Sequence, residues 1–227
     1  MRVVSIIALM FGTQLVYAQQ ADVDIALAGS QRCISLSGYH DWQFGKRKKL
    51  FVGVGARLSF YSGKDQYYVT APAKLTSGER GPQVFFIPNI TRNMDSLLVG
   101  KPAVLLSNIF LDLGYRFSDR LAVGFNIDLI GFSNGTKIRG TYINGDQRIS
   151  VGANVSHFNV LLVSDNDIGS LNSELYAKYR LTDKLRLKAG FQFLFTEYKS
   201  DFKVQQSPEP NDRFRRKSLM AMVGICF

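Results

Sequence analysis

The sequence predicts an all-β fold: a closed antiparallel up-and-down transmembrane β-barrel of about eight strands, preceded by a cleaved signal peptide. Three observations predict it. Apolar and polar residues alternate in segments about as long as a tilted membrane strand, roughly 9 to 11 residues. The connections between these segments alternate between short and long, and the chain begins with an export signal. Its 227 residues are enough for one sizeable β domain.

The export signal is predicted at residues 1–18, and the barrel domain at residues 19–227. A single basic residue, Arg2, precedes an apolar stretch from Val3 to Gly12, and small Ala18 follows as the cleavage site. This stretch is too short to be a spanning helix. Neither cysteine lies at the cleavage site, so we expect no lipid anchor there.

The clearest alternation lies in Leu121 to Leu129, where Leu, Val, Phe, Ile and Leu occupy the odd positions and Ala, Gly, Asn and Asp the even ones. A period of two predicts a strand whose two faces meet different surroundings. The same rule gives the other predicted strands, which are Ala21 to Gly29, Ile34 to Phe44, Leu50 to Phe60, Leu105 to Phe117, Leu171 to Leu181, Leu185 to Phe195 and Leu219 to Phe227.

Three connections are tight, at Gly45 to Lys49, Ser118 to Arg120 and Thr182 to Lys184, and three are long, at Ser62 to Ala103, Ser133 to Ser170 and Lys199 to Asp212. Tight periplasmic turns and long outer loops are typical of outer-membrane barrels. Tight turns and long loops reverse the chain at opposite rims, so the last segment and the segment Ile34 to Phe44 run in the same direction. Where the barrel closes, these two would be parallel neighbours unless one more strand lies between them. Ala21 to Gly29 is included chiefly because it closes the ring.

Alternation alone also fits the strands of a soluble sandwich, so the membrane prediction depends on the export signal, the repeated loop asymmetry and the aromatic residues. Aromatic side chains gather near segment ends, as expected of interfacial girdles. They are Trp42, Phe44, Phe60, Tyr61, Phe117, Phe132, Phe195 and Phe227.

The polar faces of the predicted strands carry charges of both signs. An Arg or Lys facing lipid near the midplane would cost about 2 to 4 kcal/mol, so we expect these residues to face the lumen. Eight strands leave an interior about wide enough for side chains, which predicts an interlocked charge network rather than an open channel. We expect glycines on the same faces, such as Gly124 and Gly224, to make room for long Arg and Lys neighbours. The predicted network is Arg57, Asp112, Arg116, Asp128, Glu174, Lys178, Arg180, Arg186 and Lys188.

The last segment alternates through Leu219, Ala221, Val223 and Ile225 and finishes at Phe227. In this layout the chain resembles the small outer-membrane β-barrel superfamily, the OmpA/OmpX-like proteins, including Bacteroidetes-type outer membrane beta-barrel domain proteins. The resemblance implies a location in the Gram-negative outer membrane. It also implies that Phe227 belongs to a signal read by the barrel-assembly machinery.

No catalytic, metal or cofactor site is predicted, and we do not expect an enzyme. His40 and His157 are the two histidines, and no metal-binding spacing accompanies them. In an extended strand, neighbouring Ser156 and His157 would point to opposite faces and could not share a proton. Glu174 and Asp128 fit salt-bridge partners better than an acid and base pair.

The formal net charge of +10 suggests anionic lipid or acidic polysaccharide partners for an exported chain rather than nucleic acid. The basic turn from Gly45 to Lys49 lacks the interleaved aromatics of a nucleic-acid module. An apolar patch in the longest loop, Gln83 to Pro88, is expected to cap the barrel mouth by folding inward, and the alternative is that it presents an apolar surface to a partner. Cys33 and Cys226 are expected at opposite rims, too far apart to form a disulfide.

The sequence therefore predicts a structural or interaction role, such as adhesion or binding an extracellular ligand or protein, carried by the outer loops. One alternative is a secreted lipocalin-like barrel for an apolar ligand, with Phe191 and Phe193 in the cavity and Arg186 and Lys188 in water. A small channel and an outer-membrane lipid-modifying enzyme that uses His157 are further alternatives.

Overall fold

The computed structural model describes residues 20–78, 87–162 and 166–227. The predicted signal peptide and residues 83–86 of the predicted apolar patch lie outside these ranges. Within them the protein is almost entirely β, and its strands belong to one antiparallel sheet of thirteen strands. No helix in the described part of the chain is long and apolar enough to cross a membrane.

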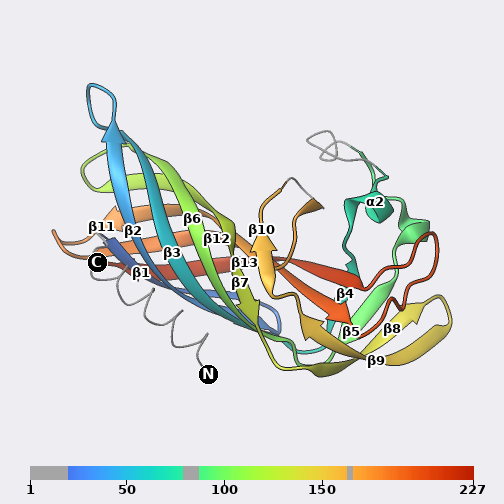
Figure 1. The fold of residues 1–227 in the computed structure, drawn as a ribbon. Helices are drawn as coiled ribbons and strands as arrows, with labels where there is room; N and C mark the ends of the chain where they lie inside the picture. Colours follow the sequence, from blue (N-terminus) through green and yellow to red (C-terminus); the bar gives the residue numbers. More distant parts are fainter. Residues whose placement is uncertain (1–19, 79–86, 163–165) are drawn as a thin grey trace.

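Eight long strands form one half of the molecule (Figure 1). Each of the eight predicted segments lies in one of them, and they pair in the order β1-β2-β3-β6-β7-β11-β12-β13. Pairing of β13 with β1 closes this circuit, which we call the ring. The strands are β1 (Gln20–Ala28), β2 (Gln31–Phe44), β3 (Leu50–Ser62), β6 (Ala103–Arg116), β7 (Leu121–Asn134), β11 (Leu171–Arg180), β12 (Arg186–Ser200) and β13 (Arg213–Cys226).

The prediction of about eight strands is too low, because the long connections contain further strands. The first contains β4 (Gln66–Thr70), the short helices α2 (Ala73–Thr76) and η2 (Thr91–Asn93), and β5 (Ser96–Val99). The second contains β8 (Ile138–Asn144), β9 (Gln147–Val155) and β10 (Phe158–Val160). Most of these strands are shorter than the segments in which a period of two is easily recognised.

Four of the added strands form a second circuit at the loop end of the ring. It runs β12-β9-β8-β5-β4-β13, and β12 and β13 belong to both circuits. Its interior is apolar and aromatic, with Tyr68, Leu97, Val151 and Phe214 buried. Tyr142 donates a hydrogen bond to Asp95, and burial together with this bond raises the pKa of Tyr142 to about 12. We call this part the outer circuit.

The two faces of the ring differ as alternation predicts. Leu175, Phe191 and Val223 are 55%, 55% and 63% exposed on the outside, whereas Arg57 and Lys188 are 1% and 2% exposed inside. Apolar outside and polar inside is the reverse of a soluble protein.

One aromatic assignment, that of Tyr61, needs correction, and one strand changes parity along its length. Tyr61 lies inside the ring and donates to Gln31 Oε1 at 3.0 Å, because the outward residues of β3 are the even-numbered ones, including Phe60. In β7 a bulge beside Ile109 and Phe110 of β6 shifts the register. As a result the exposed positions beyond it are Ile130 and Phe132.

The inward glycines make room for carboxylates and rings rather than for Arg and Lys. A Cβ on Gly224 would lie 1.9 Å from Asp24 Oδ1 and 2.7 Å from the Val23 carbonyl oxygen. A Cβ on Gly124 would lie 2.4 Å from Tyr176 Oη. At these positions the inner side chains pack directly on the opposing backbone.

Cys33 and Cys226 are both buried and free. Cys33 lies opposite Ala26 of β1 and Cys226 opposite Asp22. At about 3.3 Å per residue, this offset along β1 is roughly 13 Å, beyond the reach of a disulfide.

We predict that Gly224→Val destabilises the ring by about 1 to 3 kcal/mol, because the neighbouring carbonyl is backbone and cannot move away cheaply. The temperature at which the folded band converts to the unfolded band on a semi-native gel should fall. Gly100→Ala is the control, since a Cβ there meets nothing closer than 3.8 Å. Equal conversion temperatures for both variants would contradict the close packing.

Candidate functional site

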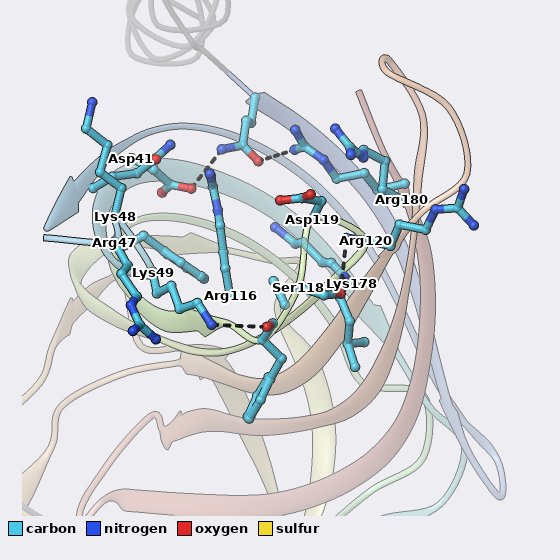
Figure 2. Close-up of a pocket in the computed structure, with 17 residues that line it drawn as sticks. Asp41, Arg47, Lys48, Lys49, Arg116, Ser118, Asp119, Arg120, Lys178 and Arg180 are labelled. Atoms are coloured by element: carbon cyan, nitrogen blue, oxygen red, sulfur yellow. Dashed lines mark hydrogen bonds between the residues drawn. The ribbon is translucent and has the colours of Figure 1, made fainter. Parts of the chain in front are cut away.

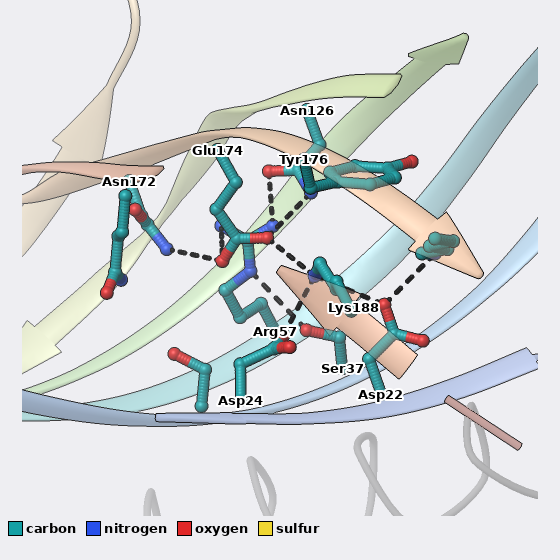
Figure 3. Close-up of polar contacts among 12 residues, drawn as sticks. Asp22, Asp24, Ser37, Arg57, Asn126, Asn172, Glu174, Tyr176 and Lys188 are labelled. Atoms are coloured by element: carbon teal, nitrogen blue, oxygen red, sulfur yellow. Dashed lines mark hydrogen bonds and ion pairs between the residues drawn. The ribbon is translucent and has the colours of Figure 1, made fainter. Parts of the chain in front are cut away.

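The ring encloses a group of ionised side chains drawn from strands on every side of it (Figure 3). Strand β3 contributes Arg57, β12 contributes Lys188, and four carboxylates come from β1, β7 and β11. Alternation turns each of these side chains inward, because its neighbours in the same strand are the exposed apolar residues. We call this group the ionic cluster: Asp22, Asp24, Arg57, Asp128, Glu174 and Lys188.

Arg57 joins two carboxylates on the opposite wall. Its Nη1 lies 3.4 Å from Asp128 Oδ1 and 3.4 Å from Glu174 Oε1. Its Nη2 donates to Asn126 Oδ1 at 2.6 Å, and its guanidinium lies 4.6 Å from the centre of the Phe110 ring. The guanidinium is therefore held by charge, hydrogen bond and aromatic face at once.

Lys188 gathers three carboxylates. Its Nζ lies 2.8 Å from Asp24 Oδ2, 2.8 Å from Glu174 Oε2 and 3.2 Å from Asp22 Oδ2. Glu174 thus bridges Arg57 and Lys188, and it also accepts from Asn126 at 2.9 Å and from Asn172 at 3.1 Å. Ammonium and guanidinium together link β1, β3, β7, β11 and β12 across the interior.

A second layer lies toward the tight turns. Lys178 Nζ is 3.1 Å from Asp22 Oδ2 and contacts Tyr39 Oη. Tyr176 donates to Asp112, whose oxygens lie 2.7 and 2.8 Å from Tyr176 Oη. Lys178 also lies over the Tyr39 and Tyr176 rings, at 4.5 and 4.6 Å from their centres. The interior here is filled by side chains, as an eight-stranded ring requires.

The nine predicted network residues divide into three groups. Arg57, Asp128, Glu174 and Lys188 meet in the ionic cluster, and Lys178 joins it through Asp22. Asp112 is buried but bonded to Tyr176. Arg116, Arg180 and Arg186 are only partly buried and lie apart, at the end of the ring formed by the tight turns.

Sequence reasoning missed Asp22 and Asp24, which supply half of the carboxylates of the ionic cluster. Both had the required signal, because they alternate with Val23 and Ile25 in β1. The neutral members Asn126 and Asn172 were also missed. Alternation does place both on the polar face of their strands, but nothing in the sequence indicates that their side-chain amides reach Glu174.

A separate polar group lies where β12 and β13 enter the outer circuit. Arg213 donates to Glu197 through Nε at 3.0 Å and through Nη2 at 2.8 Å, and Arg215 Nη2 lies 3.2 Å from Glu197 Oε2. Ser156 Oγ donates to Glu197 Oε1 at 2.7 Å. Glu197 is fully buried. Its hydrogen bond from Ser156 fastens the segment after β9 to the hairpin formed by β12 and β13.

The two histidines lie away from these groups. His40 is exposed on the apolar outer face, with its ring 4.8 Å from that of Trp42. His157 is exposed, and its Nδ1 lies 3.2 Å from the Ser133 carbonyl oxygen. Neighbouring Ser156 is buried and directed to Glu197, so the Ser156 hydroxyl and the His157 ring are not hydrogen-bonded to each other.

No family model matches the chain, and no curated protein matches it. Among solved structures it is similar to Neisserial surface protein A, with 9% identity and a TM-score of 0.39 over 91% of this chain and 93% of that one. It is also similar to the Pseudomonas putida toluene transporter TodX, with 8% identity and a TM-score of 0.25 over 86% and 69%. It is similar as well to a FadL homologue of Pseudomonas aeruginosa, with 13% identity and a TM-score of 0.23 over 86% of this chain and 67% of that one.

We predict that Lys188→Met destabilises the protein by about 3 to 5 kcal/mol, because it leaves three buried carboxylates without their shared cation. Urea unfolding in detergent micelles measures the change. Adding Asp24→Asn should recover part of the loss, since one of the uncompensated charges is then removed.

Lys184→Met is the matched control, because Lys184 is exposed in a tight turn. It should change the free energy of unfolding by less than about 0.5 kcal/mol. A loss for Lys188→Met no larger than for this control would mean that the ionic cluster does not hold the ring together.

Proposed function

We propose that the chain is an outer-membrane β-barrel protein with a sealed lumen, and that its outer end performs a structural or interaction role. The observation that carries this proposal is the apolar belt around the ring. Every strand of the ring presents at least one large apolar side chain that is more than a third exposed. One from each strand in turn is Ile25, Leu36, Val54, Leu113, Phe125, Leu175, Phe191 and Val223.

Such a belt is unfavourable in water, since large continuous apolar patches on soluble proteins are rare and mark sites of contact. Hydrocarbon is the environment that suits it on all sides of the ring. A closed ring also satisfies the backbone of each strand from its two neighbours, which lipid requires of any strand that crosses it.

The lipocalin-like alternative requires the opposite arrangement and is wrong. Phe191 and Phe193 are 55% and 43% exposed on the outside rather than within a cavity. Lys188 is buried and paired with carboxylates instead of lying in water.

The direction of insertion follows from the connections. The tight turns lie at one end of the ring and the outer circuit at the other, and periplasmic turns with extracellular loops are the usual arrangement. This layout supports the resemblance to OmpA/OmpX-like barrels. We therefore assign the outer circuit to the cell surface and propose the barrel-assembly machinery as a partner, with Phe227 exposed beside Ala21.

The sealed lumen distinguishes this proposal from a channel. The ionic cluster and the layer of Tyr39, Tyr176 and Lys178 occupy the interior between the two ends. An ion entering from either side would have to displace paired charges, each of which would then be left uncompensated in a buried site.

An interaction role is supported by the order of the outer circuit. Its strands continue the hydrogen bonding of β12 and β13, so the described part of the loop end presents an ordered surface. Binding residues are commonly carried by loops fixed on a rigid scaffold. We do not assign catalysis to it, since His157 contacts a backbone carbonyl and Ser156 contacts Glu197.

We predict that Leu175→Arg reduces folding into lipid by about 2 to 4 kcal/mol, because it places a cation on the belt near its middle. Folding into phosphatidylcholine vesicles, followed by the heat-dependent gel shift, measures the effect. Phe202→Arg is the control: Phe202 is equally exposed but lies in the loop between β12 and β13. If both variants fold equally well, the belt does not contact lipid.

We further predict that the purified protein gives no conductance steps above background in planar bilayers at salt concentrations from 0.1 to about 1 M, a range over which charge screening increases strongly. Protease protection of the protein in phosphatidylcholine vesicles checks separately that it inserts into lipid. Regular, reproducible steps would favour a channel over a sealed lumen.

A further inference from the structure

The end of the ring formed by the tight turns contains a cavity of about 570 Å³ (Figure 2). Its walls come from the turn before β3, the turn between β6 and β7, and the adjoining ends of β11 and β12. This size is within the range of small-molecule sites. We call it the basic mouth, because its lining carries two carboxylates, Asp41 and Asp119, against the cations Arg47, Lys48, Lys49, Arg116, Arg120, Lys178, Arg180 and Arg186.

Most of these cations form no close ion pair with a described residue. Lys178 pairs with Asp22, and Arg180 lies 3.9 Å from Asp183, a residue that is almost fully exposed. For the other six, no carboxylate of the described residues lies within 4.0 Å. The basic mouth therefore differs from the ionic cluster above it, where each cation touches at least two carboxylates.

Neutral contacts hold three of the six in place. Lys49 Nζ donates to the Phe117 carbonyl oxygen at 3.4 Å and lies 5.8 Å from the centre of the Tyr115 ring. Arg186 Nη1 donates to Gln20 Oε1 at 2.7 Å, while Gln20 Nε2 donates to Asp41 Oδ2 at 2.7 Å. The Arg116 guanidinium lies 6.0 Å from the centre of the Phe51 ring. Figure 2 shows Arg116 reaching across the opening between Asp41 and Asp119.

Like charges gathered around a cavity repel one another, and the low dielectric constant of the surrounding protein focuses their field on its centre. A multivalent anion there would neutralise several of them at once. Arginine is well suited to phosphate, because its planar fork donates two parallel hydrogen bonds to one phosphate group.

We propose that the basic mouth is a binding site for a compact anion that carries two or more phosphate groups. Arg116 is the central contact, and the cations of the turns complete the site. Such a ligand would enter from the side of the tight turns and would not cross the ring, since the layer of Lys178 and Tyr39 closes its inner end. The phosphates could belong to a soluble compound or to the headgroups of the adjacent lipid leaflet.

The test uses the full chain folded in octyl glucoside micelles, which contain no phosphate, with pyrophosphate as the probe in a calorimetric titration. We expect saturable binding. Arg116→Gln should weaken it about tenfold and Arg120→Gln severalfold, because each removes a charged hydrogen bond to the anion. The affinity should also fall as salt is raised.

The matched control is Arg148→Gln, which removes the same charge from an exposed position of β9 in the outer circuit. It should bind pyrophosphate as the unaltered protein does. The heat-dependent gel shift verifies that each variant is folded. Absence of saturable binding by the unaltered protein, or an equal loss in the control, would overturn the proposal.

A second arm identifies the source of the phosphate. Pyrophosphate affinity is compared in nanodiscs of phosphatidylcholine alone and in nanodiscs that also contain phosphatidylglycerol. A lower affinity with phosphatidylglycerol, lost in Arg116→Gln, means that lipid headgroups occupy the basic mouth. Equal affinity in both means that the site is reserved for a soluble compound.

Discussion

The enclosure of ionised side chains within the ring is the constraint on which the rest of the structure depends. Because strand side chains alternate, every outward Leu or Phe has an inward neighbour, and eight strands leave space inside for side chains alone. Charges placed there must neutralise one another locally. Glu174 does so for both Arg57 and Lys188. The glycines follow from the same constraint, since Asp24 fits only where Gly224 presents no Cβ.

The need to neutralise enclosed charges is met differently in the ionic cluster, at the middle of the ring, and in the basic mouth, at its end. In the middle, carboxylates from β1, β7 and β11 match the cations. Toward the tight turns the carboxylates become fewer while the cations increase, so Arg116, Arg120 and Arg186 remain without acidic partners within 4.0 Å in the described chain. An unmatched charge is tolerable there because water reaches it, whereas beside Lys188 it would be buried. Solvent access therefore divides a structural cluster from a surface able to take a ligand.

Much of the ring could be predicted from its period of two, including the weak first strand that closes it. The partners inside could not be predicted, because alternation gives the face of Arg57 but not which residue across the ring lies at its height. Glu197 has outward parity in β12 yet is buried, since a segment far along the chain, at Ser156, covers it. The β8–β9 hairpin did have a local signal: Gly145-Asp146 between alternating segments is a typical pair for a two-residue turn, and treating the whole connection as a loop overlooked it.

The outer circuit is built on the ring rather than attached to it. Strands β12 and β13 pair without interruption from Arg186 opposite Cys226 to Lys199 opposite Arg213, so one hairpin passes from the ionic cluster into the outer circuit. A hinge between the two parts would have to break this ladder and expose Glu197 with its two arginines. The described strands of the outer circuit are therefore fixed relative to the ring. A partner that binds there loses little free energy to ordering the chain, which favours recognition by a rigid surface over folding upon binding.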